Sequence, residues 1–83
     1  LDIVARQRET LVFVEVKTRH ATSTESAFAA ITPAKREKLI RAVYAYLESN
    51  DANDAIWRID AIAIALPRAG KPVIHHVQDA LNW

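Results

Sequence analysis

The chain has 83 residues, of which 51% are hydrophobic and 25% are charged, and its formal net charge is +1. These values are typical of one small globular domain, and they exclude a disordered chain and a helical membrane protein. The absence of cysteine excludes disulfides and thiolate metal sites, and agrees with the cytoplasmic location that we expect. The small net charge gives no global indication of nucleic-acid binding, so such evidence must come from local clusters.

The first strand is expected at residues 1–5, where the sequence already looks like the middle of a strand. We therefore expect a further piece of the domain upstream, and apolar surface that favours self-association, such as a homodimer. A polar connection over residues 6–10 leads to a second strand at residues 11–18, which predicts an antiparallel hairpin. The apolar start of this second strand is typical of a strand that is buried on both faces.

Residues 19–31 read as a loop with a short turn at residues 25–29. Thr32 and Pro33 predict the start of a helix that continues over residues 34–48, with Thr32 as the N-cap. Helical spacing predicts the face of this helix that packs on the sheet: Leu39, Ile40, Val43, Tyr44 and Leu47. A linker, a third strand at residues 56–65, a turn, a short strand at residues 73–77 and a brief helical tail complete the expected order.

Glu15 and Lys17 are the charged residues that end the buried second strand. Side chains alternate along a strand, so both project from one face, about 7 Å apart. If the hairpin loop is centred on Arg8 and Glu9, Asp2 stands directly opposite Glu15 with Cβ atoms about 5 Å apart. Facing carboxylates repel each other unless a proton or a cation lies between them, whereas a loop of odd length would place Asp2 on the other face.

This pattern is typical of a site for a hard divalent cation, Mg²⁺ or Mn²⁺. Asp2 and Glu15 supply the carboxylates of the predicted site, and the Val16 backbone carbonyl is a further candidate ligand. Lys17 then acts as a catalytic residue that positions the attacking water or stabilises charge on a phosphate. Basic residues that could contact a nucleic-acid backbone follow the strand and begin the long helix: Arg19, His20, Lys35, Arg36, Lys38 and Arg41.

Each of these assignments has a structural alternative. Glu15 and Lys17 could form a solvated ion pair at the end of a strand, and the basic residues could form an ordinary solvated helix face. Arg58 and Asp60 lie on one strand face and are expected to form a structural ion pair. His75 and His76 point to opposite sides of a short strand, so a structural or surface role is expected for both. Trp57 and Trp83 are expected to pack in the core or at its edge.

Four segments carry a resemblance to the YraN-like family of small bacterial proteins: residues 1–5, 11–19, 32–35 and 58–60. This family belongs to the restriction-endonuclease-like superfamily and is similar in its core to Holliday-junction resolvases. The resemblance implies an α/β fold, a mixed β-sheet flanked by helices, which in this chain lacks its first helix and strand. It also implies a PD-(D/E)xK-type site, in which Asp2, Glu15 and Lys17 match the catalytic residues.

The chain departs from the family pattern at two places. An acidic residue just before Asp2 and another on the upstream helix are not in this sequence, and Gln7-Arg8 stands where many relatives have Asp-Gly. The leading prediction is a Mg²⁺-dependent endonuclease-like domain that acts on DNA, including branched DNA. The alternatives are a catalytically inactive nucleic-acid-binding or scaffold domain on the same fold, and a dimeric protein-interaction module.

Overall fold

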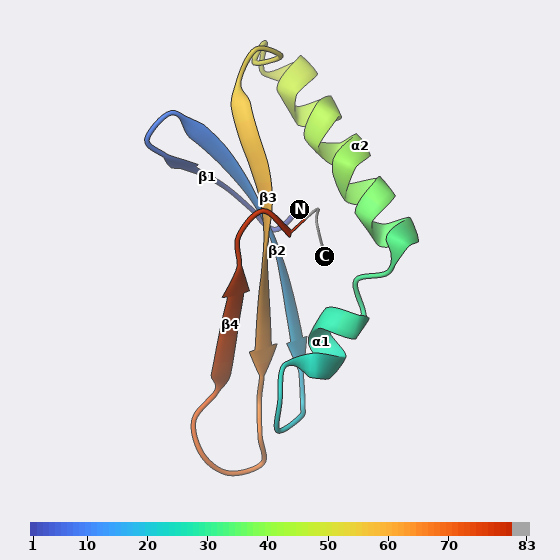
Figure 1. Ribbon diagram of the computed structural model, residues 1–83, viewed down its shortest axis with the longest axis vertical. Coiled ribbons are helices and arrows are strands. Elements are labelled where there is room, and N and C mark those ends of the chain that lie inside the picture. Colours follow the sequence, from blue (N-terminus) through green and yellow to red (C-terminus); the bar gives the residue numbers. More distant parts are fainter. Residues whose placement is uncertain (81–83) are drawn as a thin grey trace.

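The computed structural model describes residues 1–80 as one mixed four-stranded sheet with two helices (Figure 1). The expected α/β class is therefore confirmed, and the arrangement agrees with a restriction-endonuclease-like core. The elements, in chain order, are β1 (Ile3–Gln7), β2 (Thr10–Arg19), α1 (Glu25–Ala29), α2 (Pro33–Ser49), β3 (Ile56–Ala65) and β4 (Val73–Val77).

The order of strands in the sheet is the same as their order in the chain. β1 and β2 form the expected antiparallel hairpin, β2 and β3 are parallel, and β3 and β4 are antiparallel. Parallel neighbours need a long crossover connection, which α1 and α2 provide here between β2 and β3. The mixed sheet thus follows from the position of the helices in the chain.

Both helices lie on one face of the sheet, which we call the helix-side face (Figure 1). The main core forms where β2 and β3 meet α2, from six buried residues: Leu11, Phe13, Ile59, Leu39, Val43 and Leu47. The other face, which we call the open face, carries no helix from residues 1–80. Alternation along the strands assigns every strand residue to one of these two faces.

The expected helix over residues 34–48 is confirmed as α2, and its start is capped as predicted. The Thr32 Oγ1 accepts a hydrogen bond from the Lys35 backbone N–H at 3.3 Å, and Pro33 is the first helical residue. The turn expected at residues 25–29 is the short helix α1. Ala61 and Ala63 of β3 are buried on the helix-side face, and small side chains at these positions allow α1 and its flanking segments to approach the sheet closely.

Three expectations require correction or lie beyond the described residues. The first strand starts at Ile3, not at residue 1, and ends at Gln7, because the turn occupies only two residues. Tyr44 does not face the core: its exposed fraction is 57%, and Tyr46 packs on Phe13 in its place. Residues 81–83 of the expected helical tail, Trp83 among them, lie outside the described residues, whereas Trp57 packs on Phe13 as expected.

Candidate functional site

Asp2 and Glu15 face each other across the β1–β2 hairpin. The strands pair with Ile3 opposite Val14 and Gln7 opposite Thr10, which is the register predicted for a loop centred on Arg8 and Glu9. The Asp2 N–H donates to the Val14 carbonyl at 3.0 Å and continues this register to the first residues of the chain. The two carboxylates therefore lie on the helix-side face of the sheet, where Glu15 follows the core residues Leu11 and Phe13 along β2.

The pKa values of the two carboxyl groups are shifted in opposite directions. The Val16 N–H donates to Asp2 Oδ2 at 2.8 Å, and this bond, together with a hydrogen bond from the Glu15 side chain, holds the pKa of Asp2 below its usual value. Partial burial raises the pKa of Glu15, and the neighbouring Asp2 carboxylate raises it further. Glu15 is thus the member of the pair that retains a proton more readily.

Lys17 lies two residues beyond Glu15 on β2 and projects from the same face. The Lys17 ammonium lowers the pKa values of both Asp2 and Glu15. Its influence is smaller than that of burial, of the hydrogen bonds and of the contact between the two carboxyl groups. Within residues 1–80 it makes no ion pair within 4.0 Å. The ammonium is therefore close enough to act electrostatically on the carboxylates without being bound to either.

Comparison with known proteins identifies the family. Residues 1–64 match the model of the family described as "Uncharacterised protein family UPF0102". The chain belongs to the UPF0102 family. This confirms the YraN-like resemblance, which includes the segments that carry Asp2, Glu15 and Lys17.

Individual UPF0102 proteins are similar to the chain over nearly all of its length. A UPF0102 protein of Herpetosiphon aurantiacus is 44% identical over 82 residues, which cover 94% of this chain and 65% of that protein. A UPF0102 protein of Geotalea daltonii is 42% identical over 82 residues, which cover 99% of this chain and 65% of that protein. The chain thus spans somewhat less than two thirds of the length of these UPF0102 relatives.

The donor atoms at the UPF0102 hairpin fit Mg²⁺ or Mn²⁺ better than Zn²⁺. Residues 1–80 contain no group of three or more histidine, cysteine, aspartate or glutamate side chains that could hold a metal ion. Mg²⁺ does not need such a group, because it is commonly held by one or two carboxylates with water and phosphate oxygens as the other ligands. Asp2 and Glu15 supply two carboxylates of this kind. The Val16 carbonyl points to the same side of β2 as its N–H, which bonds to Asp2.

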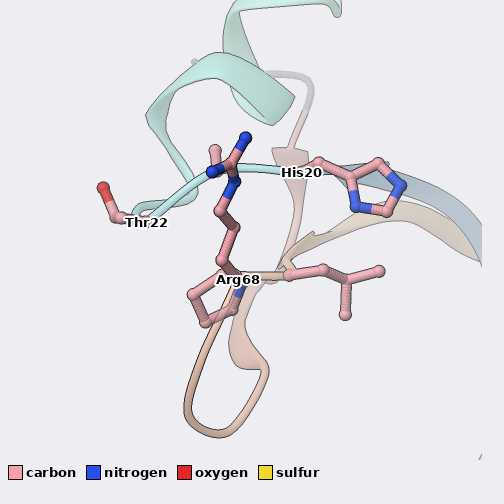
Figure 2. A pocket seen from close by; sticks show the side chains of 6 residues that line it. His20, Thr22 and Arg68 are labelled. Atoms are coloured by element: carbon pink, nitrogen blue, oxygen red, sulfur yellow. The ribbon is translucent and has the colours of Figure 1, made fainter.

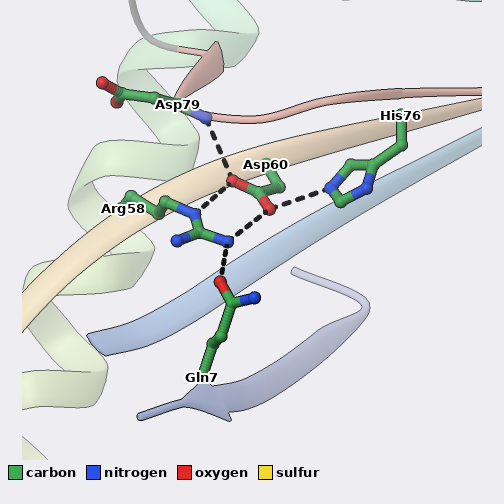
Figure 3. A network of polar contacts seen from close by, with 5 residues as sticks. All are labelled: Gln7, Arg58, Asp60, His76 and Asp79. Carbon is green, nitrogen blue, oxygen red and sulfur yellow. Dashed lines mark hydrogen bonds and ion pairs between the residues drawn. The ribbon is translucent and has the colours of Figure 1, made fainter. Parts of the chain in front are cut away.

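A second polar cluster lies around Asp60 on the open face (Figure 3). The side chain of Asp60 is 1% exposed and accepts hydrogen bonds from Arg58 Nε at 2.9 Å and from the Asp79 N–H at 3.0 Å. The His76 ring lies 2.9 Å from Asp60 Oδ2, and Arg58 also donates to Gln7 on β1 at 2.9 Å. The expected Arg58–Asp60 pair is confirmed, and it connects β1, β3 and the segment after β4.

The contacts of Gln7, His76 and Asp79 with this cluster are not predicted from the sequence, because each depends on strand register between distant segments. The available signal is the pair of charged residues, Arg58 and Asp60, in an otherwise apolar strand. Burial by itself raises the pKa of Asp60, but the hydrogen bonds from Arg58, the Asp79 N–H and His76 outweigh it and hold the pKa below its usual value. His75 points to the opposite face, as expected, and its ring packs edge-to-face on Phe28.

The predicted nucleic-acid-binding residues lie on two different elements. Lys35, Lys38 and Arg41 are exposed along one side of α2, as their spacing of three residues requires. Arg36 is half-buried, so it does not share this exposure. Arg19 ends β2, is exposed and donates to the Thr18 carbonyl at 3.0 Å. The structure thus presents exposed positive charge at both places.

A shallow pocket lies beyond the ends of β2 and β3 (Figure 2). It is lined by three residues from each connection: His20, Ala21, Thr22, Leu66, Pro67 and Arg68. Figure 2 shows the side chains of His20 and Thr22 directed away from each other, with Arg68 extending between them. Because these polar side chains do not point toward one another, they do not form a catalytic or binding site in the pocket.

Within residues 1–80, neither helix is long and apolar enough to cross a membrane.

Proposed function

We propose that the chain carries the site of a Mg²⁺-dependent nuclease that hydrolyses DNA phosphodiesters. The observation that supports this most directly is the facing pair of carboxylates, Asp2 and Glu15, with the Lys17 ammonium on the same face. A pair of this kind is destabilising in an unliganded hairpin, and a divalent cation between the carboxylates removes the repulsion. Membership of the UPF0102 family agrees with the proposal but assigns no reaction.

Each residue has a distinct role in this proposal. Asp2 and Glu15 hold the cation, and the hydrogen bond from the Val16 N–H fixes the Asp2 carboxylate in position. The cation, when bound, supplies Lewis-acid stabilisation of the phosphate and lowers the pKa of a bound water. Lys17 orients the attacking water and stabilises the negative charge that develops on the phosphate oxygens. The glutamate must be deprotonated to act as a ligand, so its raised pKa makes cation binding depend on pH.

DNA is the proposed substrate because exposed positive charge lies at the end of β2, beyond Lys17, and along α2 on the same side of the sheet as the site. Four exposed basic residues are suited to phosphate contacts: Arg19, Lys35, Lys38 and Arg41. Arg36 is the half-buried member of the proposed DNA-binding set. The resemblance to Holliday-junction resolvases favours branched DNA over linear duplex. Because the chain spans about 65% of the length of its relatives, we propose this substrate for the complete protein.

The test is cleavage of linear and four-way-junction DNA by the full-length protein with Mg²⁺ or Mn²⁺. Glu15→Gln and Lys17→Ala should each reduce the cleavage rate by about 100-fold or more, since each removes a group that acts in the transition state. Glu48→Gln is the matched control, because Glu48 is exposed at the end of α2 and should leave the rate unchanged.

Two outcomes would contradict the proposal. Cleavage that survives Glu15→Gln would place the activity elsewhere. Salt-dependent DNA binding without cleavage, equal in the wild type and in Glu15→Gln, would instead establish the alternative of a catalytically inactive binding or scaffold domain.

A further inference from the structure

The turn of the β1–β2 hairpin holds an arginine in an unfavourable backbone conformation. Arg8 and Glu9 are the two turn residues, and Arg8 has φ = 55°. In this left-handed region a side chain collides with its own backbone, so glycine is the preferred residue at the first position of such turns. A strained residue at an exposed tip is a reason to look for a function of its side chain. The Arg8 side chain is exposed to solvent.

The tip is anchored to the rest of the sheet, although it stands clear of both helices (Figure 1). Gln7, which immediately precedes the turn, accepts a hydrogen bond from Arg58 at 2.9 Å, and Arg58 is itself paired with the buried Asp60 (Figure 3). The backbone of the tip is therefore held at a defined position relative to β3. A rigid support of this kind lowers the entropic cost when the side chains of the tip bind a partner.

Arg6 adds a second positive charge on the side of the candidate site. It lies on β1 at an even-numbered position, as Asp2 does, so both side chains project from the helix-side face. Four residues of strand separate them, which corresponds to about 13 Å. Within residues 1–80, β1 is an edge strand whose five residues are all exposed, and neither Arg6 nor Arg8 makes an ion pair.

We infer that Arg6 and Arg8 form a second phosphate-contact surface, which begins about 13 Å from the candidate site and holds the DNA backbone away from the phosphate that is cleaved. The inference rests on the proposed function and extends it with residues outside the β2 and α2 clusters. Asp2 and Arg6 project from the same face of β1, so a backbone that reaches the carboxylates can continue along that face to the tip. Arginine suits this contact because its planar guanidinium binds two phosphate oxygens at once.

The test combines two variants whose effects on stability differ. Arg8→Gly removes the charge and also relieves the unfavourable φ, so it should weaken DNA binding without lowering the melting temperature. Arg6→Ala removes the other charge. Each should weaken binding to DNA about tenfold in 0.1 M salt, and should reduce the slope of log K against log salt by about 1. Binding is measured by fluorescence anisotropy on the full-length protein, with Ca²⁺ in place of Mg²⁺. Arg8→Lys, which keeps the charge, is the control that should retain most of the affinity.

The outcomes separate this inference from the proposed function. Reduced affinity and slope in both variants support it, whether or not the wild type cleaves DNA. Wild-type cleavage and binding with both variants unchanged would overturn the inference and leave the nuclease proposal standing. Absence of DNA binding by the wild type would overturn both.

Discussion

At the scale of single residues, the two facing carboxylates are chemically unequal. Asp2 receives a backbone hydrogen bond that stabilises its charged form, whereas Glu15 is partly buried beside a charge of the same sign. Asp2 is therefore the fixed anion of the pair, and Glu15 is the group whose protonation responds to its surroundings. A cation that binds between them competes with the proton on Glu15.

Glu15→Gln is predicted to stabilise the protein in the absence of divalent cations. It removes a like-charge cross-strand pair, whose repulsion costs about 0.2–1 kcal/mol, and should raise the melting temperature of a domain of this size by about 1–8 °C at pH 7. Because the pKa of Glu15 is raised on folding, wild-type stability from this group increases as the pH falls through that pKa, and is lost as the pH rises through it. The difference in melting temperature between the wild type and Glu15→Gln should therefore become smaller as the pH is lowered.

Thermal denaturation from pH 7 to pH 4 in the presence of a chelator measures this difference. Asp2→Asn is the comparison, since it weakens the acceptor for the Val16 N–H and should destabilise the hairpin. A melting temperature that falls in Glu15→Gln at pH 7 would show that the two carboxylates do not repel each other.

Asp60→Ala is predicted to be strongly destabilising. It removes the carboxylate that pairs with the Arg58 guanidinium, which is 22% exposed and keeps its bond to Gln7, and that accepts from the Asp79 N–H, at a cost of about 2–4 kcal/mol. His76→Gln should cost less, about 1 kcal/mol, because His76 is 44% exposed and water replaces its hydrogen bond. Urea denaturation at pH 7 measures the free energy of unfolding of both variants. Equal losses in the two variants would contradict the central position of Asp60 in the cluster.

The pH dependence of the Asp60 cluster has the opposite sign to that of Glu15. Its folded pKa is lowered, so its stabilisation is present above the usual aspartate pKa and is lost as the pH falls through the folded pKa. The difference in stability between the wild type and Asp60→Ala should accordingly narrow in strong acid.

At the scale of elements, α2 is positioned by its cap and by one apolar side. Thr32→Ala is predicted to cost about 1 kcal/mol, because it removes the hydrogen bond to the Lys35 N–H. The corresponding fall in melting temperature is about 4–8 °C. Thr24 occupies the same position before α1 but makes no capping bond with its side chain, so Thr24→Ala is the matched control. Similar losses in both variants would show that the cap of α2 contributes nothing particular.

The sequence predicts these elements well where local chemistry decides them. Thr32 and Pro33 mark the start of α2, and the alternation at Glu15 and Lys17, together with an even loop, predicts the register that brings Asp2 opposite Glu15. Tyr44 is misassigned because helical spacing cannot distinguish a core position from the neighbouring edge, where its ring packs against Trp57 while remaining largely exposed. Contacts that depend on the pairing of distant strands, such as that of His76 with Asp60, have no local signal.

At the scale of the whole molecule, the sheet has two unlike faces. One carries the helices, the core and the candidate site, and the other carries the Asp60 cluster among aliphatic residues. The exposed fractions of Ile3 and Ile74 on the open face are 48% and 65%. Substitution of either should have little effect on stability, unlike substitution of the fully buried Phe13.

The most direct test of the account is calorimetric titration of the full-length protein with Mn²⁺ at pH 7. The account predicts one site in the wild type that is weakened about tenfold or more in both Glu15→Gln and Asp2→Asn, and is unchanged in Glu48→Gln. It also predicts weaker binding at lower pH, because the cation must displace the proton that Glu15 holds there. Equal Mn²⁺ binding in all four proteins, or none in the wild type, would contradict a metal site between Asp2 and Glu15.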